Sequence, residues 1–166
     1  MKRIGSKRGQ QIMGMPFSMM FAIFLIIIFI VVAFMGIRFF LSFGRTADVG
    51  LFYEELQGAV DDAWSGQSGS FSFEINLPDK IQKICFANLS APITGNREEY
   101  NQIELYEFKS VNLFLIPPGD AEGMHYKQIE HLDLARIIET QNPYCVDVKD
   151  GLTIQKDFYD KLVWIE

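Results

Sequence analysis

An uncharged apolar run at residues 12–37 constrains this chain more than any other feature. It reads IMGMPFSMMFAIFLIIIFIVVAFMGI and contains no acidic or basic side chain. The hydrocarbon core of a bilayer is about 30 Å thick and needs roughly 20 apolar helical residues, so a run of this length spans it even when tilted. We therefore expect a transmembrane helix over residues 12–41, in contact with membrane lipid and preceded by a basic leader at residues 1–11.

Charged side chains are distributed very unequally along the chain. The first 44 residues hold five basic groups and no acidic one, whereas residues 45–166 hold ten basic and all 21 acidic groups. Basic flanks stay in the cytoplasm, so we expect a single-pass protein of the cell membrane with a cytoplasmic N-terminus and an extracytoplasmic C-terminal domain. The acidic character of that domain makes nucleic acid an unsuitable partner.

The segment just ahead of the apolar run carries a second signal, Lys7-Arg8-Gly9-Gln10. It resembles the class III signal peptide of archaeal type IV pilin-like proteins, and the whole chain is similar to uncharacterised archaeal single-span membrane proteins. The pilin resemblance implies cleavage between Gly9 and Gln10, a filament built from the apolar helix, and a following helix that continues the membrane helix and packs on a β-domain. The chain departs from that pattern at Gly14, where many such proteins have Glu, and at Pro16. An unprocessed signal anchor with a basic flank stays open beside it.

After the span, residues 42–46 predict a break or hinge, followed by an amphipathic helix, so that residues 42–69 form one segment. Apolar side chains recur there every three or four residues, and Glu and Asp occupy the other face. Thr46 or Asp48 is a suitable N-cap, and the glycines of residues 65–69 should end the helix. The apolar positions, which we expect in a core, are Val49, Phe52, Tyr53, Leu56, Ala59, Val60, Ala63 and Trp64.

Residues 70–166 read mainly as strands, which predicts a small α+β, mainly antiparallel β domain. Strict alternation indicates a half-buried strand at 70–77. Short apolar runs indicate strands buried on both faces at 84–87 and 111–116. Asp150-Gly151 is typical of a tight hairpin, here between strands at 144–148 and 152–155. A closing strand is expected at 162–165, while 126–138 fits a strand or a helix equally well.

The two cysteines, Cys85 and Cys145, fall inside predicted strands on the side expected to be oxidising. We expect them to form a disulfide, which closes a loop of about 60 residues and stabilises the fold by about 4 kcal/mol through loop-closure entropy. Two buried free thiols are the alternative. A zinc site is disfavoured because neither cysteine belongs to a C-x-x-C pair.

The sequence contains no signature of a catalytic, cofactor or metal site. The nucleophile-elbow, H-E-x-x-H, P-loop and dinucleotide motifs are all missing. His125 and His131 lie near several acidic residues, but their six-residue spacing puts no pair on one helical face and fixes no third ligand. Asn88-Leu89-Ser90 is a glycosylation sequon, which makes Asn88 a candidate glycan site on the outer side.

Three functional classes follow from these observations. The favoured one is a membrane-anchored cell-envelope protein whose disulfide-stapled domain acts through structural or protein–protein contacts with other envelope proteins, not as an enzyme. The alternative is a pilin-like filament subunit, processed between Gly9 and Gln10, whose partners are other such subunits. A third class, an outward-facing enzyme or ligand-binding domain, has no converging residues to support it.

Overall fold

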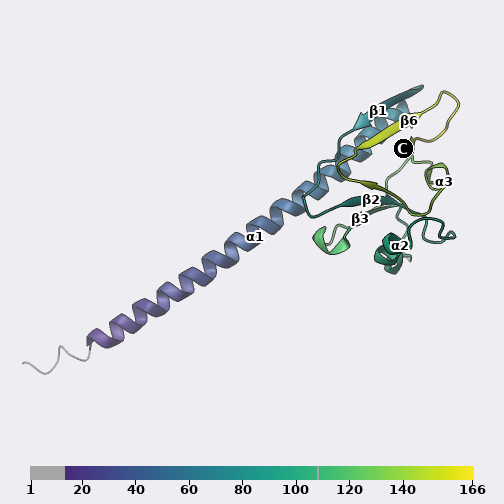
Figure 1. The fold of residues 1–166 in the computed structure, drawn as a ribbon. Helices are drawn as coiled ribbons and strands as arrows, with labels where there is room; N and C mark the ends of the chain where they lie inside the picture. Colours follow the sequence, from purple (N-terminus) through teal and green to yellow (C-terminus); the bar gives the residue numbers. More distant parts are fainter. Residues whose placement is uncertain (1–13, 108) are drawn as a thin grey trace, which may run out of the picture. The chain divides into compact units, whose positions relative to one another are not determined.

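The computed structural model describes residues 14–107 and 109–166, and its first element is the helix α1 (Gly14–Ser65) (Figure 1). The chain divides between Ser42 and Phe43 into two compact units. In the first unit, the side chains of residues 17–41 are all exposed. This helix is long and apolar enough to cross a membrane, as the sequence predicts. The leader, with Gly9 and Gln10, lies outside the described residues.

The predicted break at residues 42–46 is wrong, because α1 continues through them. Gly44 is the weakest helix former of the five, and one glycine costs a helix only about 1 kcal/mol relative to alanine. The turns that follow are held by burial of their apolar side chains, which outweighs that cost. Thr46 and Asp48 consequently lie inside the helix and do not cap its start.

In the second unit, the C-terminal part of α1 has the predicted amphipathic character. Its outward positions Glu54, Glu55 and Asp62 are exposed, and the helix ends at Ser65, as expected. The prediction that Trp64 lies in the core is wrong, because its side chain is 42% exposed. It belongs to the last turn of the helix, where its ring stacks on His131 with the ring centroids 3.9 Å apart. The buried positions are Val49, Phe52, Tyr53, Leu56 and Val60.

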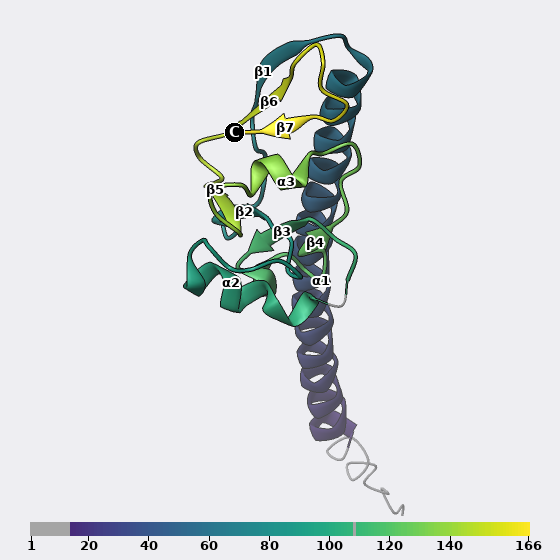
Figure 2. The same cartoon turned by 90° about the vertical axis from the view of Figure 1, so that its right-hand side faces the viewer.

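Two antiparallel sheets complete this unit (Figure 2). The three-stranded sheet has the order β1-β6-β7, and the four-stranded sheet has the order β4-β3-β2-β5. The first consists of β1 (Gly69–Phe73), β6 (Leu152–Lys156) and β7 (Trp164–Ile165). The second consists of β4 (Tyr126–Lys127), β3 (Leu113–Ile116), β2 (Lys83–Phe86) and β5 (Tyr144–Asp147).

The short helices are α2 (Arg97–Ile103) and α3 (Leu134–Ile137), with 3-10 turns η1 (Glu104–Tyr106) and η2 (Pro118–Asp120). The ambiguous segment 126–138 therefore contains both β4 and α3. The sequence interpretation missed α2, although its start carries a recognisable cap. The Glu98 backbone N–H donates to Asn96 Oδ1 over 2.9 Å, and two glutamates stand in the first turn.

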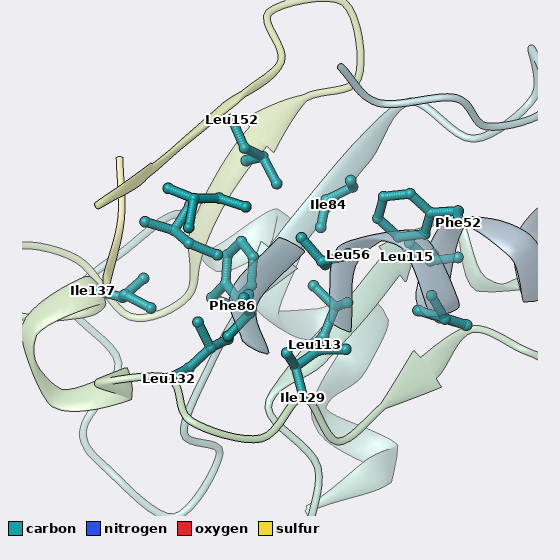
Figure 3. Packing of buried hydrophobic residues seen from close by; sticks show 14 of the residues in the cluster. Phe52, Leu56, Ile84, Phe86, Leu113, Leu115, Ile129, Leu132, Ile137 and Leu152 are labelled. Atoms are coloured by element: carbon teal, nitrogen blue, oxygen red, sulfur yellow. The ribbon is translucent and has the colours of Figure 1, made fainter. Parts of the chain in front are cut away.

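The four-stranded sheet is buried on both faces because its central strands are apolar at successive positions. On one face, Ile84 and Phe86 of β2 join Leu113 and Leu115 of β3 against the α1 residues Phe52 and Leu56 (Figure 3). The side chains that alternate with these along β2 and β3, such as Cys85 and Phe114, point to the other face of the sheet, as the pleat requires. That second face forms a smaller core of Cys85, Ala87, Leu89, Ile103, Phe114 and Ile116. The predicted two-sided burial of these strands is confirmed.

Two strand predictions need correction. The strand at 70–77 is regular only as far as Phe73, after which the chain leaves β6. Asp150-Gly151 forms a turn but no hairpin, because β5 and β6 belong to different sheets. Gly151 has φ +73°, and a Cβ there would lie 3.1 Å from the Phe73 carbonyl oxygen. Glycine is thus required where the chain crosses between sheets, and local turn chemistry does not specify that crossing.

Candidate functional site

The predicted disulfide is present, and it joins the edge strand β5 of the four-stranded sheet to the neighbouring strand β2. Cys85 on β2 and Cys145 on β5 are direct cross-strand partners, with their Cα atoms 4.0 Å apart. Cys85 is fully buried, so external thiols do not reach its sulfur directly. The bridge locks β5 onto the sheet across a sequence separation of 60 residues.

A carboxylate lies beside this bridge. The two sulfurs and a Glu99 oxygen lie within 4.8 Å of one another. Lys83 Nζ donates to Glu99 Oε1 over 2.7 Å, and this hydrogen bond raises the pKa of Lys83. Because the sulfurs are bonded to each other and the carboxylate is paired with Lys83, the trio offers no free ligand set in the oxidised protein.

The two histidines lie in separate environments. His125 packs between the rings of Tyr106 and Tyr126, with centroid distances of 4.5 and 4.9 Å. Neither of its ring nitrogens has a hydrogen-bond partner among the described residues, and burial lowers its pKa. His131 instead stacks on Trp64 at 3.9 Å, with Asp61 3.9 Å from its Nε2. Among the described residues, neither histidine joins a group of three metal-ligating side chains.

The sequon occupies a well-ordered surface turn. Asn88 is exposed, and its Oδ1 accepts from the Ser90 backbone N–H over 3.1 Å. Behind it, the buried Asn142 side chain accepts from Asn88 N and donates to Asn88 O. The backbone N–H of Asn142 also donates to Thr94 Oγ1 over 2.9 Å, which ties Asn142 to the loop between β2 and α2. The Asn88 side chain is therefore presented outward on a rigid support.

A groove of about 650 Å³ lies beside this turn. Its described walls come from residues 88–90, 107, 109–112, 128–132 and 134, and they include His131 but not His125. The lining is mixed, with Glu107, Lys109 and Glu130 along it and no cluster of nucleophile, base and orienting group. The described lining residues thus form no assembled reaction centre.

The end of the second unit at the last turn of α1 carries exposed aromatic side chains. Phe158 is 61% exposed and Tyr159 is 91% exposed, and their rings pack edge-on at 5.1 Å. Trp64 Nε1 donates to the Lys161 carbonyl over 3.1 Å, which ties their loop to α1. Lys156 Nζ donates to the carbonyls of Trp64 and Gly66, placing a positive charge at the helix C-terminus. We call this surface the aromatic end; it comprises Trp64, Phe158 and Tyr159, all at least 42% exposed.

An arginine also holds the same loop in place. Arg136 Nη1 donates to Asp160 Oδ2 over 2.7 Å, and Arg136 Nη2 lies 3.6 Å from Asp157 Oδ2. The guanidinium carbon lies 4.0 Å from the centroid of the Trp164 ring. Phe158 and Tyr159 are therefore exposed on a loop that is anchored at both sides. The sequence gives the residue types of this surface but not their exposure, since Asp-Phe-Tyr-Asp is equally compatible with a buried aromatic pair.

Comparisons with protein-family models, with curated proteins and with solved structures find no match to this chain.

Proposed function

We propose that this chain is a single-pass, membrane-anchored cell-envelope protein that presents its disulfide-stapled β-rich domain outside the cell and acts through structural or protein–protein contacts. One observation carries the proposal. A helix suited to a membrane leads into a unit with its own core and disulfide, and that unit exposes anchored aromatic side chains. Exposed aromatics on a rigid support are typical of protein contact sites.

Orientation is tested by labelling single introduced cysteines in intact cells with a membrane-impermeant maleimide. The native cysteines are bonded to each other and therefore do not react with the maleimide. We expect Gln67→Cys, in the exposed turn after α1, to label in intact cells. The matched variant Gln11→Cys, on the basic side of the apolar run, should label only after permeabilisation. The reverse pattern would place the domain in the cytoplasm and overturn the proposal.

Contact through the aromatic end is tested by site-specific photo-cross-linking in living cells. A photoreactive residue in place of Tyr159 should give discrete cross-linked products. One in place of Leu105, which is 72% exposed on η1 and away from the aromatic end, serves as the matched control. Equal cross-linking at the two positions would show that the aromatic end is no preferred contact surface.

A pilin-like filament subunit is the second candidate. Supporting it, α1 continues without a break from its apolar part into the part that packs on an antiparallel sheet, the arrangement that the pilin resemblance implies. In this case the mature protein should begin at Gln10 and be recovered in sheared surface filaments. Gly9→Val should block that processing, while Gly5→Val should leave it intact. A mature protein that retains residues 1–9 would exclude this candidate.

A further inference from the structure

Strand β1 forms an unprotected edge of the three-stranded sheet. It pairs with β6 alone, in a continuous register from Gly69 opposite Lys156 to Phe73 opposite Leu152. Four of its five residues are exposed, and its sequence, Gly-Ser-Phe-Ser-Phe, has no charge and no proline. Alternate N–H and C=O groups of a strand point to opposite sides, so the outer side of β1 presents unsatisfied backbone donors and acceptors.

The other sheet edges in the described part of the chain are protected. The β7 side is covered by a parallel bridge from Leu132 to Val163, with Val163 N–H donating to the His131 carbonyl over 2.8 Å. Strand β4 has only two residues, one of them Lys127. Strand β5 ends in Asp147. Short length and charged residues are the usual devices against edge pairing, and β1 has neither.

The sequence of β1 is complementary to itself in one antiparallel register. When two copies pair about a two-fold axis at Phe71, each Phe71 lies opposite the other and Ser70 lies opposite Ser72 of the second copy. Gly69 then faces Phe73, a glycine–aromatic pair that stabilises edge strands. Aromatic–aromatic and hydroxyl–hydroxyl pairs are favourable across strands, and no like charges meet. A two-fold contact of this kind is self-complementary by construction.

We propose that β1 pairs with β1 of a second copy of this chain, and that the second copy stands on a facing membrane. Within the second unit, β1 runs antiparallel to α1, since Gly69 follows Ser65 closely and Phe73 returns to Phe52, 6.3 Å away between ring centroids (Figure 1). The two-fold axis of an antiparallel pair is perpendicular to the sheet, so it reverses the direction of α1. Within the paired domains, the two Phe43 ends then point in opposite directions, which favours partners anchored in two facing membranes.

The pairing is weak for one pair of molecules and strong for an array. A stable interface buries at least about 1,000 Å², more than five paired residues provide alone. Membranes that carry many copies gain avidity, because each contact raises the effective concentration for the next. This inference rests on the proposed function, since the domain must face outward to meet another membrane.

The test uses the full-length chain in liposomes, with outward orientation verified first by protease accessibility. Two vesicle populations carry chains with different epitope tags. Directly opposed Cα atoms lie about 4.5–5.5 Å apart, within disulfide range, so Phe71→Cys should form disulfide dimers that contain both tags. Ser70→Cys alone and Ser72→Cys alone should not, because the like positions lie more than about 7 Å apart. Mixing the Ser70→Cys and Ser72→Cys populations should restore the cross-link.

Vesicle clustering provides a second readout that does not depend on cysteine chemistry. Ser72→Lys places a charge on the edge and should abolish clustering, while Ser68→Lys, exposed but outside β1, should leave it unchanged. Dimers confined to one vesicle population, or equal cross-linking by every cysteine variant, would overturn the proposed pairing. These outcomes leave the proposed function standing, whereas failure of the orientation test alone would reject the proposed function.

Discussion

Replacing Asn112 should strongly destabilise the domain. Asn112 is 5% exposed, and its amide forms two hydrogen bonds to the main chain of Ile129, which is itself 1% exposed. Asn112 Nδ2 donates to the Ile129 carbonyl over 2.8 Å, and the Ile129 N–H donates to Asn112 Oδ1 over 2.8 Å. The side chain thus substitutes for a neighbouring strand just where β3 and β4 separate.

The size of the effect follows from the groups left behind. In Asn112→Ala, one buried N–H and one buried C=O lose their partners, and each unsatisfied group costs about 1–3 kcal/mol. We therefore expect a loss of about 2–6 kcal/mol in the free energy of unfolding. Thermal unfolding of the detergent-solubilised protein, followed by near-ultraviolet circular dichroism, measures this loss.

Two further variants make the Asn112 experiment specific. Asn101→Ala removes an exposed asparagine from α2 and should change the midpoint little. Asn112→Asp keeps the shape but replaces the donor with a carboxylate facing the Ile129 carbonyl, which raises the pKa of that carboxyl in the folded state. The stability of this variant relative to wild type should therefore be greatest at low pH, where the acid is protonated, and fall as pH rises. Equal midpoints for Asn112→Ala and Asn101→Ala would refute the reasoning.

Three other predictions test the remaining features. Removing the bridge with Cys85→Ala and Cys145→Ala together should lower stability by up to about 4 kcal/mol, and the intact bridge should appear as a linked peptide pair in non-reducing mass spectrometry. Burial lowers the pKa of His125 below 6.5, so the unfolded state binds more protons and stability should decline as pH falls below 6.5; a pH-independent midpoint for both wild type and His125→Phe would contradict this. Glycosylation at Asn88 should add mass that both Asn88→Gln and Ser90→Ala remove, and a native mass equal to that of the bare chain would exclude it.

The sequence by itself determined the features whose physics is local. The apolar run can satisfy its backbone only as a helix if it lies in lipid, and a helix is present there. Three- and four-residue spacing predicted which side of α1 is buried, as Phe52 and Leu56 show. Runs without polar interruptions predicted β2 and β3, and compartment chemistry predicted the bond between Cys85 and Cys145.

Only the tertiary structure decided the features that depend on contacts between distant segments. Asp150-Gly151 makes the same turn within a hairpin or between sheets, and the pairing of β6 with β1 instead of β5 decides which. The partners of Asn112 are 17 residues away and involve main-chain groups, which no side-chain pattern reveals. Trp64 has the spacing of a core residue, yet it is 42% exposed and its ring stacks on His131, 67 residues away in the sequence. Local propensities therefore predict the elements, while their order in the sheets, and with it the free edge of β1, follows from long-range packing.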